Sequence, residues 1–269
     1  MSAIAPQPNG APSGAVATAR RYGADFAPYL VLAAVWQVAA LAFPPYLFPS
    51  LTSVLERFFD IVTSVTQFTN VLATLWRILA GLAGAFLFGG VLAFLMARSR
   101  AVDRFLGPIL TFFQGIPALS WVVFAIIWIH GIELRIFVIM VMTTLPAFTF
   151  QILGALRAMS KDLFEMVLSF RPTRWKIFRV MVLPSILLDI LTAWKVNLGN
   201  ASRVVVVAEL VGATGGIGYE LLQQQQLFDM TGALAWTLQL VFFVLIVQRL
   251  LAWIEASAFR YRALSERSM

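Results

Sequence analysis

Long runs of apolar residues recur along this chain, and they limit its possible structures more than any other feature. A helix needs about 20 mostly apolar residues to cross the hydrocarbon core of a bilayer. The segments that meet this requirement lie near residues 26–44, 70–97, 107–129, 134–156, 184–211 and 232–254. Because only helices and closed barrels satisfy their backbone hydrogen bonds inside lipid, these runs predict an all-α membrane protein with about six transmembrane helices.

The composition supports this class and excludes others. Hydrophobic residues make up 60% of the chain and charged residues 12%, with a mean hydropathy of +0.85, whereas soluble domains carry roughly 25% charged residues. The net charge of +7 is spread between apolar runs instead of gathering on one face, so no nucleic-acid partner is expected. The chain has no cysteine and a single histidine, His130, which we interpret as an interfacial residue, so no metal site is expected.

Two local features modify the simple pattern of spans. Gly115 and Pro117 interrupt the third apolar run, which predicts two half-helices or a re-entrant turn packed inside protein. A Pro-rich turn after the first run leads into Leu51–Val65, which has the pattern of an amphipathic surface helix. Residues 1–19 consist mainly of Pro, Gly, Ala and Ser and are predicted to be a disordered tail, followed by a transmembrane domain over residues 20–262 and a second tail over 263–269.

The distribution of basic residues predicts the orientation, because Lys and Arg in short loops are retained on the cytoplasmic side. With both termini and both tails in the cytoplasm, the outer loops hold only Arg57 and Arg135. The cytoplasmic set is Arg20, Arg21, Arg98, Arg100, Arg104, Arg157, Lys161, Arg171, Arg174, Lys176, Arg179, Arg249, Arg260, Arg262 and Arg267.

The loop between the fourth and fifth runs has an internal pattern of its own. The segment "KDLFEMVLSF" reads as a short helix, Arg171-Pro172 as a break, and "TRWKIFRVMVLP" as an amphipathic helix that runs into the fifth span. A basic loop that only fixes topology is the alternative. The aromatic residues favour a docking element for another protein; they are Phe164, Phe170, Trp175 and Phe178.

This loop resembles a cytoplasmic motif of the permease subunits of ATP-binding-cassette (ABC) importers, in particular those of the nitrate, sulfonate and taurine group. That motif begins with Glu-Ala-Ala, has Gly six residues after the Glu, and ends with Leu-Pro. Glu165 and Leu183-Pro184 match it, whereas Met166-Val167 replace the alanines and Arg171-Pro172 stand at the glycine. The likeness continues from Pro45 to Arg262 in "FPSLTSVLERF", "PILTFFQGIPALSW" and "VVVVAELVGATGGIGYEL".

The resemblance implies a type I ABC importer permease fold in a bacterial inner membrane. Two permease subunits, expected to be a homodimer, would form the path, and an extracytoplasmic solute-binding protein would deliver the solute. Cytoplasmic ATPases would bind ATP and Mg and would grip coupling helices at about residues 160–182. This chain has no phosphate-binding Gly-Lys-Ser/Thr loop, so no cofactor is expected on it. The implied coupling residues are Glu165, Ser169, Phe170, Arg171, Pro172, Thr173, Arg174 and Trp175.

Two cations within the fifth run, Lys195 and Arg203, are the main candidates for residues that line the path. Intramembrane charges usually face a bundle interior or a water-filled cavity. Asn197 and Asn200 add polarity to the same helix, and Gln114, Trp121 and Thr143 are further candidates. The alternatives are ordinary packing for these three residues and structural ion pairs for the cations, with Asp189 or Glu209 as partners.

Together these features predict a transporter subunit that works by alternating access, with a small oxyanion or organic anion as substrate. An importer of a neutral or cationic vitamin precursor is the alternative, and a passive channel or scaffold is a further one. A membrane-embedded enzyme is disfavoured, because the polar residues do not supply a convergent nucleophile, base or metal set.

Overall fold

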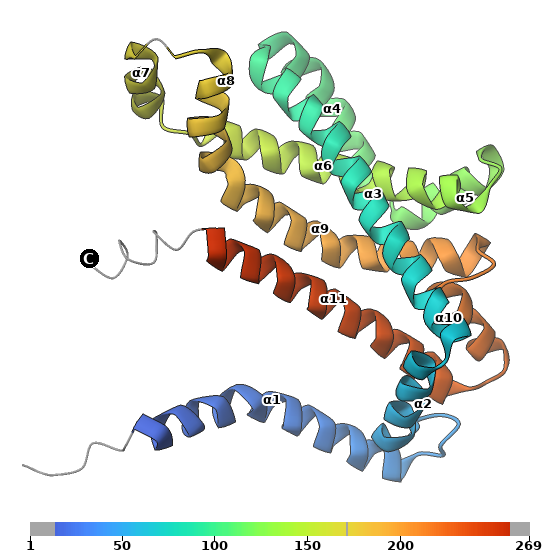
Figure 1. Cartoon of the computed structure of the whole chain (residues 1–269). Helices are drawn as coiled ribbons and strands as arrows, with labels where there is room; N and C mark the ends of the chain where they lie inside the picture. The colour runs from blue at the N-terminus through green and yellow to red at the C-terminus, as the bar shows by residue number, and fades with distance from the viewer. Residues whose placement is uncertain (1–13, 171, 259–269) are drawn as a thin grey trace, which may run out of the picture.

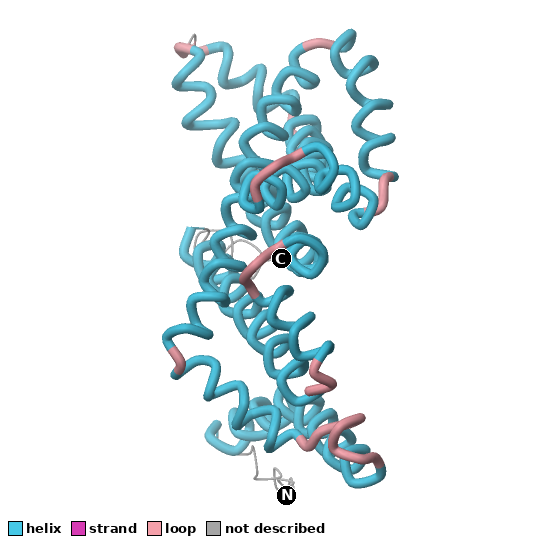
Figure 2. Tube along the Cα trace, turned by 90° about the vertical axis from the view of Figure 1, so that its right-hand side faces the viewer, coloured by secondary structure: helices cyan, strands magenta, loops and turns pink. Residues whose placement is uncertain are grey.

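The computed structural model describes residues 14–170 and 172–258, and within these ranges every regular element is helical (Figures 1 and 2). The tail over 263–269 lies outside the described residues, as do residues 1–13, whereas residues 14–19 of the expected tail are part of the first helix. The elements are α1 Gly14–Ala42, α2 Leu51–Thr63, α3 Val65–Arg98, α4 Arg100–Gly115, α5 Ala118–Trp128, α6 Ile132–Arg157, α7 Lys161–Ser169, α8 Arg174–Ile177, a π-helical turn Phe178–Val182, α9 Leu183–Gly212, α10 Ile217–Gln226 and α11 Met230–Ala258.

Four stretches of the described chain are helices long and apolar enough to cross a membrane. They are Val65–Arg98, Ile132–Arg157, Trp175–Gly212 and Met230–Ser257, and the bent pair of α4 and α5 is a fifth if it counts as one span. These correspond to the second to sixth predicted runs. The first run falls on α1, whose described apolar part, Leu30–Ala42, is shorter.

The predicted break in the third run is confirmed. Helices α4 and α5 meet at an angle of 95°. Ile116 has φ −75° and ψ 123°, an extended conformation, because the ring of Pro117 disfavours helical geometry in the residue before it. The same proline lies at the N-terminal cap of α5, where its missing N–H leaves no unsatisfied helical bond.

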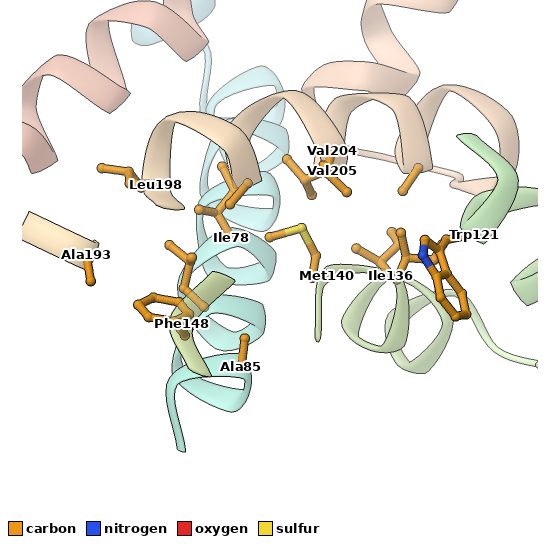
Figure 3. Close-up of a cluster of buried hydrophobic side chains, with 14 of the residues drawn as sticks. Ile78, Ala85, Trp121, Ile136, Met140, Phe148, Ala193, Leu198, Val204 and Val205 are labelled. Carbon is orange, nitrogen blue, oxygen red and sulfur yellow. The ribbon is translucent and has the colours of Figure 1, made fainter. Parts of the chain in front are cut away.

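The core lies where α3, α6 and α9 cross, and Figure 3 shows their apolar side chains pointing toward one another. Ile78 of α3, Met140 of α6 and Val205 of α9 are almost completely buried there. Helix α3 approaches α6 so closely that a Cβ atom on Gly81 would lie 2.5 Å from the Cβ of Met140. Small residues allow this kind of close helix packing in membranes.

Helix α2 matches the predicted amphipathic helix and ends two residues earlier than expected. Its N-terminal cap is Ser50, whose hydroxyl accepts a hydrogen bond from the backbone N–H of Ser53 at 3.2 Å. Val54, Phe58 and Ile61 recur at helical spacing and form its buried face. The start of α2 also holds α1, which otherwise stands apart from the bundle in Figure 1: the backbone N–H of Leu51 donates to Gln37 Oε1 at 3.2 Å, and Trp36 Nε1 donates to the carbonyl of Pro49 in the preceding loop at 3.1 Å.

Helix α8, the π-helical turn and α9 form one continuous helical stretch, as predicted for a loop helix that runs into the fifth span. Pro184 has no backbone N–H and therefore cannot complete the regular α-helical ladder. The wider turn instead joins the N–H of Leu183 to the carbonyl of Phe178. Figure 1 places α7 and α8 at one end of the bundle and α10 at the other, and we call these the α8 end and the α10 end.

Candidate functional site

The α8 end carries a protruding pair of short helices, α7 and α8, joined by a turn. The Ser169 hydroxyl donates to the carbonyl of Met166 at 2.6 Å and closes the last turn of α7. Phe170 is 79% exposed and Trp175 69% exposed, and the Trp175 ring stacks on Phe178 at a centroid distance of 5.7 Å. We call Glu165, Phe170 and Trp175, all exposed, the α7–α8 surface.

The α7–α8 surface has the character of a protein-binding site. Large aromatic side chains clustered on an exposed surface mark interaction sites in most proteins. Pro172 is half-buried and Thr173 exposed between the two helices. Arg171 lies outside the described residues, and the structure describes only the backbone of Arg174.

A polar stripe runs along one face of α9. Asp189, Thr192, Asn200 and Arg203 are all exposed and recur, with Val196 between them, at intervals of three or four residues. Residues with this spacing share one face of a helix. Because a charged group in lipid costs several kcal/mol, a polar face on a spanning helix is expected to meet water or protein.

The two cations predicted to border the path have different surroundings. Lys195 forms an ion pair with Glu255 of α11, so its charge is neutralised, although by neither of the partners proposed from the sequence. Arg203 is exposed on the stripe, and no described carboxylate lies within ion-pair distance of it.

Of the other predicted path residues, Asn200 shares the polar stripe with Arg203, and the rest do not gather with it. Asn197 is buried between α9 and α6, where its amide donates to the side-chain oxygen of Gln151 at 2.7 Å. Trp121 belongs to the core in Figure 3, and its indole nitrogen has no hydrogen-bond partner among the described residues. The Thr143 hydroxyl donates within its own helix to Ile139 at 2.8 Å, and Gln114 is exposed at the end of α4.

A buried ionic cluster at the α10 end was missed by the sequence analysis. Arg77 of α3 is 8% exposed and contacts two carboxylates. Its Nη1 donates to Glu209 of α9 at 2.7 Å and its Nη2 to Glu133 of α6 at 2.5 Å. Charged residues within apolar runs usually pair inside the bundle or face a cavity. This rule applies to Arg77 as much as to Lys195 and would have identified Arg77.

The ionic cluster also holds the loop between α9 and α10. Arg77 Nη1 donates to the carbonyl of Gly215 at 2.7 Å, and the backbone N–H of Gly218 donates to Glu209 at 2.9 Å. Gly216 has φ +115°, and a Cβ atom there would lie 2.4 Å from a carboxylate oxygen of Glu209. Only glycine adopts this conformation readily and also fits this space.

Helix α10 is attached to α3 through side chains. Asn70 donates to a carboxylate oxygen of Glu220 at 2.7 Å and accepts from the N–H of Gly216 at 3.0 Å. Burial raises the pKa of Glu220, and the positive charge of Arg57 partly opposes this shift. No group of three His, Cys, Asp or Glu side chains in the described ranges could hold a metal ion.

The sequence of this chain is similar to a protein family and to several known transport proteins. Residues 85–260 match the protein family described as "Binding-protein-dependent transport system inner membrane component". The formylaminopyrimidine transport permease protein ThiX of Halalkalibacterium halodurans is 28% identical over 209 residues, which is 77% of this chain and 83% of the relative. The taurine transport system permease protein TauC of Escherichia coli is 26% identical, with 71% of each chain covered.

Two further comparisons extend the range of relatives. The riboflavin transport system permease protein RibX of Chloroflexus aurantiacus is 29% identical over 203 residues, which is 74% of this chain and 75% of the relative. Among solved structures, the MetNI methionine ABC transporter in an inward-facing conformation has a TM-score of 0.60 and 20% identity, and the match covers 73% of this chain and 99% of that chain. That similarity shows a shared fold.

Proposed function

Since the chain belongs to the family of binding-protein-dependent transport system inner membrane components, and is therefore a permease subunit of an ABC transporter, we propose that it forms the solute path of an ATP-driven importer. Two copies of the chain enclose the path, an extracytoplasmic protein delivers the solute, and separate ATPases hydrolyse ATP on the cytoplasmic side. In the bacterial inner membrane, the α8 end and both termini face the cytoplasm, in agreement with the distribution of basic residues.

The observation that carries this proposal is the α7–α8 surface and its connection to the membrane. Phe170 and Trp175 are exposed at the end of the bundle, and α8 continues through Trp175–Gly212 into a spanning helix. A partner that grips α8 therefore acts directly on α9. Closure of the ATPases then moves α9 and switches the path between inward-facing and outward-facing states.

For the substrate we propose a small oxyanion or organic anion that Arg203 attracts at the α10 end of the path. Arg203 is the exposed cation of the polar stripe, whereas the charge of Lys195 is neutralised by Glu255. Relatives named for taurine and aliphatic sulfonates support an anion. Relatives named for formylaminopyrimidine and riboflavin support a neutral or vitamin-precursor substrate as the second candidate.

Reconstitution of the chain with its ATPase and solute-binding protein in vesicles tests the proposal. We expect solute uptake that requires ATP, and we expect Trp175→Ala to reduce the yield of the ATPase complex or to uncouple ATP hydrolysis from uptake. Trp76→Ala is the matched control, because Trp76 is 68% exposed on α3 and outside the α7–α8 surface. Uptake without ATP would instead indicate a passive channel, and equal effects of both variants would remove the coupling role.

A further inference from the structure

A cavity between α6 and α9 has no role in the function proposed so far. It has a volume of about 280 Å³ and lies at the α8 end of these helices. Small residues on both walls, such as Gly154 and Ala193, make the room for it. Its polar groups are the carboxylate of Asp189, the hydroxyl of Thr192 and the amide of Gln151, and the ring of Phe150 forms an apolar wall.

The charge of Asp189 is not compensated by a neighbouring cation. No Lys or Arg whose side chain is described lies within 4.0 Å of its carboxylate. Two cations on the adjoining elements are engaged elsewhere: Lys195 pairs with Glu255, and Arg157 pairs with Asp103 at 2.6 Å. A free carboxylate on a spanning helix is unfavourable unless water or a cationic group reaches it.

The surroundings of Asp189 suit an ammonium group better than a metal ion or an anion. Its carboxylate and the Thr192 hydroxyl offer hydrogen-bond acceptors from the same face of α9, three residues apart. The ring of Phe150 lines the cavity, and cations bind favourably over the faces of aromatic rings. Gln151 is held in place by the hydrogen bond from Asn197, at 2.7 Å. A metal ion usually requires several carboxylate or imidazole ligands, which this cavity does not supply.

We propose that this cavity is a subsite of the path, and that it takes the ammonium or similar cationic hydrogen-bond donor of the transported solute near the cytoplasmic exit. This inference rests on the proposed function. Along α9, Asp189 and Arg203 are 14 residues apart, or about 21 Å at 1.5 Å per residue. A solute with an anionic end and an ammonium end would therefore meet Arg203 first and Asp189 later, so the two charges act in succession.

Thiol labelling tests the electrostatic part of the proposal without any need for transport. The natural chain has no cysteine, so Thr192→Cys gives this chain one thiol, which lies in the cavity and is measured in the assembled complex. After each rate is divided by the rate of the same reagent with a free thiol in solution, we expect a trimethylammonium-ethyl thiosulfonate to react about tenfold faster than the sulfonatoethyl reagent, because their opposite charges interact oppositely with Asp189. The preference should disappear in the Asp189→Asn background. Ala158→Cys, on the other wall of the cavity, is a second reporter in case the first variant fails to assemble.

The matched control lies on the same helix face. Asn200→Cys is three residues from Arg203, and there the sulfonatoethyl reagent should react faster. If both reporters show the same preference, the labelling rates depend on how easily each reagent enters the protein and not on the charge next to the reporter. That result excludes the subsite. If neither reagent reaches residue 192 or residue 158, the cavity is filled by protein or lipid chains, which also overturns the proposal.

Competition distinguishes a solute ammonium from a lipid headgroup, which carries the same chemistry. In phosphatidylglycerol vesicles, ethylammonium chloride should slow the labelling of Thr192→Cys more than potassium chloride at equal ionic strength. If addition of phosphatidylethanolamine to the vesicles gives the same protection, the ammonium site belongs to lipid and the assignment to the solute is wrong. Failure of ATP-driven uptake in the reconstituted complex would contradict the proposed function but would leave these labelling rates unaffected.

Discussion

Arg77 shows how much of this bundle depends on single polar residues. It lies between a fully buried carboxylate, Glu209, and a largely exposed one, Glu133, whose side chain is 66% accessible. A buried charge that loses its partner is expensive, whereas an exposed ion pair adds little. The ion pair of Arg77 with Glu209 should therefore contribute much more to stability than its ion pair with Glu133.

We predict that Arg77→Met lowers the free energy of unfolding by about 3–5 kcal/mol, because Glu209 would remain buried without a cation. Glu133→Gln should lower it by at most about 1 kcal/mol. Thermal unfolding of the purified complex in detergent measures both variants. Similar losses of unfolding free energy in the two variants would contradict the difference between the buried and the exposed ion pair.

Substitution of Lys195 should mainly affect stability, whereas substitution of Arg203 should mainly affect transport. Lys195→Met leaves Glu255 without its cation, so we expect a lower melting temperature that Glu255→Gln partly restores in the double variant. Arg203→Met should leave the melting temperature unchanged and reduce uptake of an anionic solute, because no described residue pairs with Arg203. Normal uptake by Arg203→Met would remove the anion from the proposal.

These residues also show the limit of sequence reasoning at this scale. The pattern of the fifth run was sufficient to single out Lys195 as a path candidate, with an ion pair as the alternative. The identity of the partner was not predictable, because Glu255 is 60 residues further along the chain and depends on how α11 packs. That Arg77 needs an ion-pair partner was predictable from its place in an apolar run. Its two carboxylates come from α6 and α9, and only the packed bundle brings them together.

At the scale of helices, local chemistry predicted much of the structure. The bend between α4 and α5 follows from Pro117, and the continuous stretch from α8 into α9 follows from an amphipathic pattern that leads directly into the fifth apolar run. The π-helical turn next to Pro184 was not predicted, since a proline also fits the first turn of an ordinary helix. The tight crossing of α3 and α6 requires the packed structure, because many glycines in this chain have no close neighbour.

The crossing of α3 and α6 gives a prediction at this scale. Gly81→Ala places a methyl group 2.5 Å from the Cβ of Met140, so it should lower the free energy of unfolding by about 1–3 kcal/mol. Gly107→Ala is the matched control, because a Cβ atom on Gly107 of α4 meets nothing within 4 Å. Thermal unfolding again measures the effect. A neutral Gly81→Ala would mean that the two helices separate without loss of stability.

At the scale of the whole molecule, the sequence predicted the class, with which the family comparison agrees, and the order of the second to sixth spans, with which the described helices agree. It did not predict how the spans pack around α3, α6 and α9, since apolar runs in a membrane protein are alike whether they face lipid or core. The exposed apolar residues of α1, α3 and α11 show this, because the described part of each helix leaves many large side chains outside the core.

The orientation of the molecule remains a prediction that a labelling experiment checks. Cysteines introduced singly at Thr173 and Gln225, which are both exposed, should react with a membrane-impermeant reagent from opposite sides of intact cells or vesicles. The basic residues near the α8 end predict that Thr173 lies on the cytoplasmic side. Labelling of both positions from one side would contradict the predicted topology.

The ionic cluster at the α10 end has a mechanical consequence. There, Arg77 joins α3 to α9 through a buried ion pair and α3 to α6 through a more exposed one, whereas the ion pair of Arg157 with Asp103 at the α8 end is half-exposed. Within one copy of the chain, α3 and α9 are therefore held together by a buried ion pair at the α10 end, and the ion pair at the α8 end is more exposed to solvent. The stretch Trp175–Gly212 has 38 residues, about 57 Å at 1.5 Å per residue. A force applied at α8 therefore acts at the far end of a long arm, where the smallest force supplies the torque that turns α9 about its fixed end.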